Sequence, residues 1–242
     1  MKTVKNLTIL LFLSAFITSC GVDMFNRVDG NRNVVSEKRK INDDFTGVKV
    51  SSGIDLYIKQ GRKNQLTVEA DENLHDIIIT EVKGGILKIY TERSIWRAKA
   101  RKVYLTVTSL EELKATSGSD VYSQNTLKVK DLIVSTSSGA DMRIEVDADN
   151  VTSSSSSGSD LRITGKSNTH EAKASSGSSI HAYGLESKDV TAKVSSGADI
   201  GVYASESINA RASSGGDIRY KGSPEKVYKK SSSGGGISSR SR

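Results

Sequence analysis

The sequence predicts an all-β protein, a single-stranded right-handed parallel β-helix with about 20 residues per turn. A Ser-Gly-x-Asp unit recurs with small changes, its copies are evenly spaced, and short alternating runs flank each copy. The glycines of these units are Gly118, Gly139, Gly158, Gly177, Gly197, Gly215 and Gly234. They are separated by 21, 19, 19, 20, 18 and 19 residues. A period of this length is typical of a stacked repeat, in which each turn of chain covers the one before.

The N-terminus is typical of an export signal. Basic residues precede a short apolar run, and small residues follow it. The run is shorter than the roughly 20 residues that span a bilayer. Cys20, the only cysteine, follows Ile-Thr-Ser and precedes Gly21, which resembles a bacterial lipobox. We therefore predict a signal peptide over residues 1–19, cleavage between Ser19 and Cys20, and lipidation of Cys20. The alternative is an ordinary secretory signal with a chance cysteine.

Lipidation would anchor the chain to a membrane. A diacylglycerol thioether on Cys20 and an acyl chain on its amine would together supply the two signals that stable anchoring needs. Because Gly21 rather than Asp follows the cysteine, the sequence does not resemble an inner-membrane retention signal. We expect an outer-membrane lipoprotein, facing the periplasm or the cell surface. Residues 20–44 are predicted to be a flexible tether, residues 45–235 the folded body, and residues 236–242 a frayed tail.

Short alternating runs in the front of the folded body predict six strands. Turn residues such as Gly61 and Gly84-Gly85 separate them. The runs are Val48–Val50, Leu56–Ile58, Leu66–Val68, Ile77–Ile79, Leu87–Ile89 and Val103–Val107. One early copy of the repeat unit, Gly53-Ile54-Asp55-Leu56, stands apart from the others in this region.

The segment from Glu92 to Lys102 differs in character from its surroundings. Trp96, the only tryptophan, lies among the cations Arg93, Arg97, Lys99, Arg101 and Lys102. We expect a loop whose tryptophan covers the end of the core. The alternative is an exposed basic contact site with one aromatic anchor, which makes Trp96 and Arg97 candidate ligand-surface residues.

Alternation on each side of the repeated unit predicts two strands per turn with defined inner faces. Before the unit, the residues predicted to point inward have small side chains, for example Val190, Ala192, Val194 and Ser196. Ser176 and Ser214 occupy the position of Ser196 in other turns. After the unit, aliphatic pairs such as Ile200 and Val202 point inward. Buried serines are expected to hydrogen-bond to one another along the axis. A hairpin-built β-sandwich is the rival fold, but Asn-Gly and Asp-Gly turns are absent from the repeats.

Outward residues should form rows about 4.8 Å apart along the axis. One row contains Asp120, Asp141, Asp160, Asp199 and Asp217, and a neighbouring row contains Arg143, Arg162, His181 and Arg219. We expect each aspartate to cap its own turn and the arginines to compensate the row's charge. A calcium ladder is the alternative, but the Gly-Gly-x-Gly-x-Asp nonapeptide of calcium-binding β-rolls is missing. We predict no metal and no cofactor.

A second outward row lies on the other strand of each turn. It consists of Lys173, Lys193, Arg211 and Lys230. A solvated face is the simpler interpretation. The alternative is a surface for an acidic polysaccharide, with Lys173, Lys193 and Arg211 as its candidate ligand residues.

The residues also resemble a known family. Phe45-Thr46-Gly47-Val48, the segment from Gly53 to Gly61 and the Ser-Ser-Gly-Ala-Asp repeats are similar to the putative auto-transporter adhesin head domain, also called the GIN domain. The similarity covers nearly all of residues 45–235. It implies a β-helical envelope domain, commonly behind a lipoprotein signal in Bacteroidetes-like bacteria, and it brings no catalytic residues. The glycine-rich end, residues 231–242, departs from the family pattern.

The sequence favours a binding or structural role over catalysis. It has no Gly-x-Ser-x-Gly elbow, and His170-Glu171 lacks the second histidine of a zinc protease motif. The net charge of 35 − 28 = +7 is modest, and we expect no nucleic-acid partner. We predict a non-enzymatic, lipid-anchored envelope protein that serves as an adhesive surface or spacer, with glycans or other proteins as partners. The alternative is a polysaccharide-binding or polysaccharide-cleaving β-helix.

Overall fold

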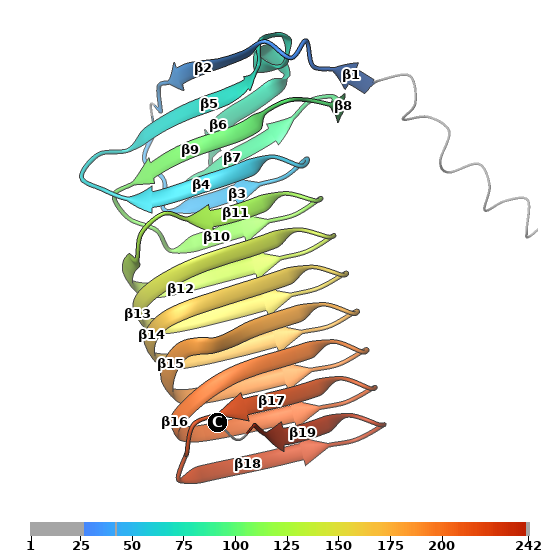
Figure 1. The fold of residues 1–242 in the computed structure, drawn as a ribbon. Coiled ribbons are helices and arrows are strands. Elements are labelled where there is room, and N and C mark those ends of the chain that lie inside the picture. The colour runs from blue at the N-terminus through green and yellow to red at the C-terminus, as the bar shows by residue number, and fades with distance from the viewer. Residues whose placement is uncertain (1–26, 42, 241–242) are drawn as a thin grey trace, which may run out of the picture.

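A computed structural model describes residues 27–41 and 43–240 and confirms the predicted fold class. The chain forms a right-handed β-solenoid of about seven turns with ~19 residues per turn (Figure 1). Its helical content in this range is one 3₁₀ helix, η3 (Glu72–Ile77), and no described helix has the length and hydropathy needed to cross a bilayer.

Two regions of strand are distinguished by their topology. The N-terminal strands are β1 (Arg27–Asp29), β2 (Val34–Arg39), β3 (Gly47–Val50), β4 (Asp55–Gln60), β5 (Gln65–Asp71), β6 (Ile78–Lys83), β7 (Ile86–Thr91), β8 (Ser94–Arg97) and β9 (Arg101–Val107). The repeat strands are β10 (Glu112–Ala115), β11 (Asp120–Ser123), β12 (Leu127–Thr136), β13 (Asp141–Ser155), β14 (Asp160–Ala174), β15 (Ser179–Val194), β16 (Asp199–Ala212), β17 (Asp217–Lys221), β18 (Lys226–Ser231) and β19 (Gly236–Ser239).

Each repeat turn has one tight corner and one wide bend. Strand β13 begins at the corner with Asp141, continues around the bend, and ends at Ser155 just before the next corner. It pairs in parallel with β14, so that Asp141 lies opposite Asp160 and Ser155 opposite Ala174. The two halves of each turn therefore form two facing walls of one continuous 17-stranded sheet, with the core between them (Figure 1).

Both residues at each tight corner have a positive φ. At one corner φ is 54° for Ser138 and 70° for Gly139, the combination found in type I′ turns. The Ala140 N–H donates to the Ser137 carbonyl across this turn at 3.3 Å, and the Gly139 N–H donates to the carbonyl of Ser157 on the next turn at 3.2 Å. The corner thus uses hairpin-type backbone geometry, but its flanking strands pair with neighbouring turns.

The predicted inward positions are confirmed, with one systematic exception. Val190, Ala192 and Val194 are buried before the corner, and Ile200 and Val202 are buried after it. The exception is the serine placed at the end of the first inward set. Those serines are exposed because they occupy the positive-φ corner, which breaks the two-residue alternation; they are Ser157, Ser176, Ser196 and Ser214.

Buried hydroxyls satisfy one another inside the solenoid, as expected. Thr136 donates to Ser155 at 3.0 Å, Ser155 and Ser159 share a hydrogen bond of 2.9 Å, and Ser159 donates to Thr136 at 3.0 Å. Because each hydroxyl can donate once and accept twice, a closed set of this kind offsets the cost of burying it.

The six strands predicted in the front region are confirmed as β3, β4, β5, β6, β7 and β9, but they do not stack in chain order. Strands β3 and β4 pair in parallel with β10 and β11 on one side and with β7 and β9 on the other. The early corner copy consequently continues the repeat column, since Asp55 lies opposite Asp120. Strands β3 and β4 therefore form the second turn of the solenoid, although they come first in the chain. Strands β7 and β9 form the first turn, and the chain then continues with β10 and β11 in the third.

The N-terminal end of the solenoid is closed by antiparallel strands and by η3. Strand β5 pairs with β9 and β2, and β6 pairs with β7. Helix η3 buries Leu74 and His75 over the end of the core. The tether prediction is wrong for residues 27–39, because they form β1 and β2. The frayed-tail prediction is wrong for residues 236–239, because β19 pairs with β17.

Asp71 connects the segments of this cap. Its carboxylate is 0% exposed and accepts the backbone N–H groups of Arg32 at 2.9 Å, Lys99 at 3.0 Å and Ala100 at 3.0 Å. Burial by itself raises the pKa of Asp71, but the N–H donors of Ala100, Lys99 and Arg32 together bring that pKa below its ordinary value. The charged carboxylate is therefore the form that holds the cap.

Asp71→Ala is expected to lower the free energy of unfolding by about 3–5 kcal/mol, because it leaves buried donors without an acceptor. Urea denaturation at pH 7 measures the change. Asp76→Ala, at an exposed position of the same helix, is the matched control and should change stability by less than about 0.5 kcal/mol. Equal losses in the two variants would contradict this role of Asp71.

His170 is a buried titratable residue in the core. It is 1% exposed, its Nε2 lies 2.9 Å from Ser153 Oγ, and its Nδ1 has no hydrogen-bond partner. Burial lowers the pKa of His170 from 6.5 to about 4. A histidine whose pKa is lower in the folded state contributes its full stability above pH 6.5 and loses it as the pH falls toward 4, a loss of about 3 kcal/mol.

His170→Val should remove this part of the pH dependence. Valine already occupies the equivalent positions Val151 and Val190 on the adjacent turns. Chemical denaturation at a series of pH values from 7 to 4 should give a flatter stability profile for the variant than for the wild type. Parallel profiles over that range would show that protonation of His170 does not limit stability.

Candidate functional site

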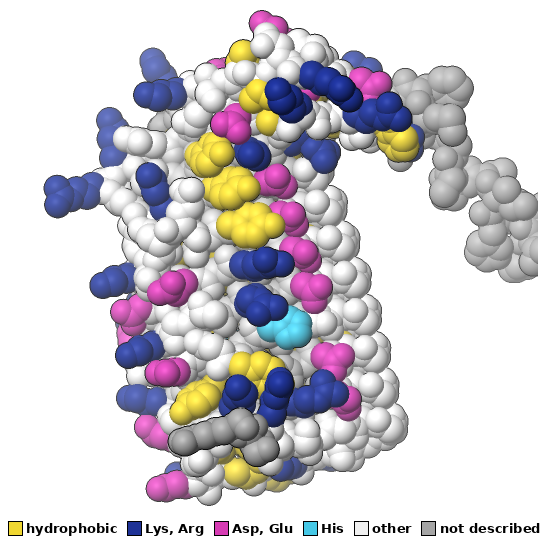
Figure 2. All heavy atoms as spheres, viewed as in Figure 1, with side chains coloured by type: hydrophobic (Ala, Val, Ile, Leu, Met, Phe, Trp, Pro, Cys, Tyr) yellow, Lys and Arg dark blue, Asp and Glu magenta, His cyan; other side chains and the backbone are white. Residues whose placement is uncertain are grey.

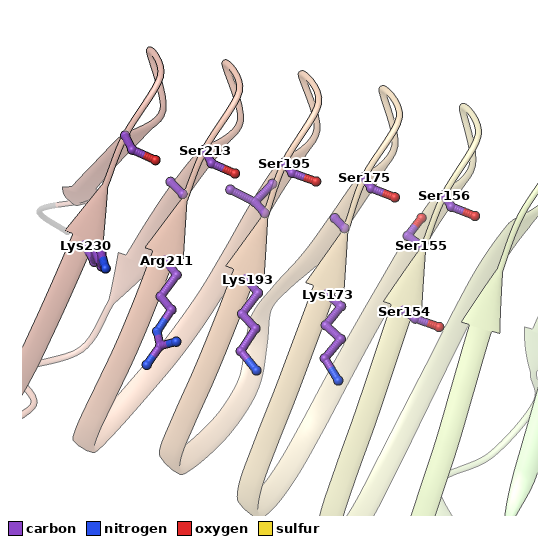
Figure 3. A pocket seen from close by; sticks show the side chains of 14 residues that line it. Ser154, Ser155, Ser156, Lys173, Ser175, Lys193, Ser195, Arg211, Ser213 and Lys230 are labelled. Carbon is purple, nitrogen blue, oxygen red and sulfur yellow. The ribbon is translucent and has the colours of Figure 1, made fainter.

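A shallow basic groove lies along one face of the C-terminal half of the solenoid. Parallel register places Lys173 opposite Lys193, Lys193 opposite Arg211, and Arg211 opposite Lys230. The groove has a volume of about 540 Å³ and is lined by four cations, seven serines and three small apolar residues, with no carboxylate among them. Figure 3 shows the cationic side chains in one row and serine hydroxyls in a second row beside it.

The serine row is set by the same register as the cations. Its members immediately precede the corner turns; they are Ser156, Ser175, Ser195, Ser213 and Ser232. The last four lie two residues beyond a cation, and Ser156 lies two residues beyond Ser154. Two residues along a strand return to the same face of the sheet. The groove therefore offers paired rows of cations and hydroxyls that repeat about every 4.8 Å along the axis.

The charge of the groove is unevenly compensated. Lys173 Nζ lies 2.7 Å from Glu171 Oε1, and Lys193 Nζ lies 3.8 Å from the same oxygen. A hydrogen bond from Lys173, together with the charges of both lysines, lowers the pKa of Glu171. Arg211 and Lys230 have no ion pair with any described residue. This end of the groove is where an external anion would find uncompensated positive charge.

The basic row extends further than the sequence analysis recognised. Lys88, Lys49 and Lys114 occupy the same column on the N-terminal turns, and Ser135 and Ser154 interrupt it. The sequence contains the pattern that predicts this extension: Lys49 and Lys114 each lie four residues before a corner glycine, as Lys173 does. It was missed because the first turns are not consecutive in the chain.

The opposite wall of the solenoid carries the predicted aspartate and arginine rows. The register confirms that the aspartates are aligned, with Ser179 in the gap, and extends the row to Asp55. The neighbouring row begins with the stacked rings of Tyr104, Tyr57 and Tyr122, whose centroids are 5.2 and 5.5 Å apart. Figure 2 shows this face, with the rings followed by cations and the carboxylates beside them.

The proposed roles of these rows are only partly supported. Where a serine precedes the aspartate, its hydroxyl closes the turn; Ser159 Oγ, before Asp160, donates to the Ser156 carbonyl at 2.8 Å. Where an alanine precedes it, the backbone N–H closes the turn, as Ala140 does by donating to the Ser137 carbonyl at 3.3 Å. Capping by the aspartates was therefore the wrong interpretation for these turns. Direct charge compensation occurs where Arg219 contacts Asp199 at 3.3 Å and Asp217 at 3.1 Å.

The pKa values along the aspartate row reflect its crowding. Burial, followed by the charge of Asp55, raises the pKa of Asp120. Burial and the charges of Asp120 and Asp160 raise the pKa of Asp141. Within the described residues, no group of three or more His, Cys, Asp or Glu side chains is arranged to hold a metal ion. The row is a crowded column of carboxylates without the geometry of a calcium site.

The remaining candidate residues lie away from the groove. Trp96 and Arg97 are in β8, at the N-terminal end of the molecule, whereas the groove lies on β14, β15, β16 and β18 (Figure 1). Trp96 is 56% exposed, so the prediction that it covers the end of the core is wrong. Leu74 of η3 occupies that position instead. Ser19 and Cys20 lie outside the described residues.

Solved structures share this architecture. A protein from Bacteroides fragilis described as a putative adhesin has a TM-score of 0.83 and 21% identity, covering 88% of this chain and 100% of its own. A putative adhesin from Parabacteroides merdae has a TM-score of 0.72 and 20% identity over 89% of this chain and 100% of its own. A protein from Parabacteroides distasonis described as a putative lipid binding protein has a TM-score of 0.72 and 23% identity over the same shares.

These likenesses establish the fold. No curated protein matches the chain. The family model described as "Putative auto-transporter adhesin, head GIN domain" matches residues 44–224, which include the aspartate row and the groove residues up to Ser213, but not Lys230 and Ser232. The chain belongs to the family of putative auto-transporter adhesin head GIN domains.

Proposed function

We propose that this protein is a non-enzymatic, lipid-anchored cell-envelope adhesin that binds acidic polysaccharide along its basic groove. The observation that carries the proposal is the alignment of Lys173, Lys193 and Arg211 in a groove without a lining carboxylate. The family and two of the three structural relatives above are described as putative adhesins, which supports a surface-binding role in the cell envelope.

A linear polyanion suits the groove better than a compact ligand does. The cations repeat along the solenoid axis at the strand spacing, so an extended chain can meet several of them in succession. Hydroxyls such as Ser175 and Ser195 stand beside the cations, where they can donate to or accept from sugar hydroxyls. Each exposed contact is worth only about 0.2–1 kcal/mol, so affinity has to come from many rungs together.

A binding role is also favoured over polysaccharide cleavage. General acid–base catalysis needs titratable groups held within reach of one bond. The polar residues that line the groove are lysines, an arginine and serines, with no carboxylate or imidazole among them, and His170 is sealed inside the core beside Ser153. The groove thus offers charge and hydroxyls for recognition, while the buried imidazole lies out of reach of a polysaccharide.

The anchoring half of the proposal rests on Cys20. Metabolic labelling with a palmitate analogue should label the wild-type protein and leave Cys20→Ala unlabelled, because the thioether needs the thiol. Cell fractionation should find the wild type with membranes and the variant in the soluble fraction. Equal labelling of the two proteins would remove the lipoprotein assignment.

The groove can be tested with polygalacturonate as an acidic probe and dextran as a neutral one. The Lys173→Ala/Lys193→Ala/Arg211→Ala variant should bind polygalacturonate roughly tenfold to a hundredfold more weakly than the wild type by calorimetry. Binding should also weaken as salt rises from about 0.05 to 0.5 M, because the screening length shortens. Dextran should not bind measurably.

A matched control separates the groove from net charge. Lys59→Ala/Arg62→Ala/Lys63→Ala removes the same charge from exposed positions in and after β4, at the other end of the molecule. This control should retain wild-type affinity for polygalacturonate. Equal weakening in both triple variants would indicate non-specific attraction, and no binding by the wild type would refute the polysaccharide proposal.

A further inference from the structure

A small tip projects from the N-terminal end of the solenoid. It consists of β1 and β8, which form a two-stranded parallel sheet separate from the main 17-stranded sheet (Figure 1). Val28 and Ile95 lie opposite each other in this sheet and pack against the core. Trp96 follows Ile95 and is therefore directed away from the core, with 56% of its surface exposed. The tip is fixed on one side and presents an indole on the other.

The exposed indole carries a cation on its ring. The guanidinium carbon of Arg27 lies 4.4 Å from the Trp96 ring centroid. A stacked pair of this kind is apolar in its body and charged at its edge. Tryptophan and arginine are both suited to the boundary between lipid headgroups and acyl chains, where one end of a side chain is wet and the other dry.

The charges around Trp96 favour an anionic partner. The exposed cations of β1 and residues 92–99 are Arg27, Arg93, Arg97 and Lys99, and the exposed carboxylates are Asp29 and Glu92. The carboxylate of Asp71 nearby is buried and bound to backbone N–H groups. The tip therefore has an excess of positive charge. Each such cation is worth about 1 kcal/mol near an anionic lipid surface.

Chain length places this tip beside the predicted anchor. Arg27 is seven residues from Cys20, and seven residues of fully extended chain span at most about 25 Å. The basic groove lies several turns further along the axis, at about 4.8 Å per turn. Of the two basic surfaces, the tip is therefore the one that a lipid on Cys20 would hold against the bilayer.

We propose that the β1–β8 tip docks on an anionic phospholipid bilayer, with Trp96 at the headgroup boundary, and so orients the solenoid on its membrane. The proposal rests on the lipid anchoring of Cys20 proposed above. It gives the exposed tryptophan a function, and it directs the basic groove away from the membrane toward external polyanions.

The test uses residues 21–242 without a lipid, a chain that retains every described residue. Trp96 is the only tryptophan, so its fluorescence reports on the tip alone. Vesicles of phosphatidylglycerol should shift Trp96 emission to shorter wavelength and, when the acyl chains are brominated, quench it. Vesicles of phosphatidylcholine should do neither. An emission spectrum unchanged by phosphatidylglycerol would overturn the proposal.

Two double variants locate the contact. Arg97→Gln/Lys99→Gln should weaken binding to phosphatidylglycerol vesicles at least about tenfold in co-sedimentation, since two cations are lost. Lys193→Gln/Arg211→Gln removes the same charge from the groove and should bind like the wild type. Loss of binding in the groove variant alone would make the groove the lipid-facing surface and refute docking by the tip.

Labelling of Cys20 separates this proposal from the one on which it rests. A labelled Cys20 with unresponsive Trp96 emission would leave the anchor intact and refute the docked orientation. An unlabelled Cys20 with a responsive Trp96 would refute the anchor, while the affinity of the tip for anionic lipid would stand as a direct measurement.

Discussion

The structure depends on one constraint, the parallel in-register pairing of each turn with the next. Once Asp141 is paired with Asp160 and Ser155 with Ala174, every intervening residue has a fixed neighbour above and below it, up to the local bulges. Equivalent residues then form columns about 4.8 Å apart. The contacts between neighbours within a column must therefore be favourable, because each residue lies between two residues with the same orientation and often the same chemistry.

The inner and outer columns meet this requirement in different ways. Inside, aliphatic residues stack, and buried hydroxyls such as Ser155 and Ser159 hydrogen-bond to each other. Outside, like charges about 5 Å apart repel by about 1 kcal/mol in water-like surroundings and more where they are partly buried. The raised pKa values of Asp120 and Asp141, caused first by burial and then by neighbouring carboxylates, reflect this cost. The cationic row is interrupted instead, by Ser135 and Ser154.

The repeats could be predicted from the sequence because their two determinants are local. Alternation identifies the inward face of Val190 and Ala192, and the glycine spacing identifies the partner one turn away. The corner serine Ser196 was misplaced because a pair of positive-φ residues interrupts alternation, and only the backbone geometry reveals it. The same spacing predicts that the cations of the groove form a row. It does not predict that the groove has no lining carboxylate.

The N-terminal cap could not be predicted in this way, because its contacts are not periodic. Strand β5 pairs with β2 and β9 in antiparallel fashion, and β7 and β9 stack beyond β3 and β4, which precede them in the chain. Asp71 is a single residue whose role depends on N–H groups from two separate segments, Arg32 in one and Lys99 with Ala100 in the other. No spacing rule points to such a site, and the same is true of the exposed position of Trp96.

The two ends of the solenoid also differ in how their terminal strands are covered, and this difference is relevant to function. The N-terminal end is closed by η3 and antiparallel strands, while β18 at the other end is exposed along its whole length. Val227 and Tyr228 are exposed there, but Lys226, Lys229 and Lys230 accompany them. Lysines on an edge strand oppose pairing with another copy of the chain. Under the proposed function, positive charge near this end has two purposes: Lys230 extends the groove that we propose to bind a polyanion, and the same cluster opposes growth of the solenoid by addition of strands.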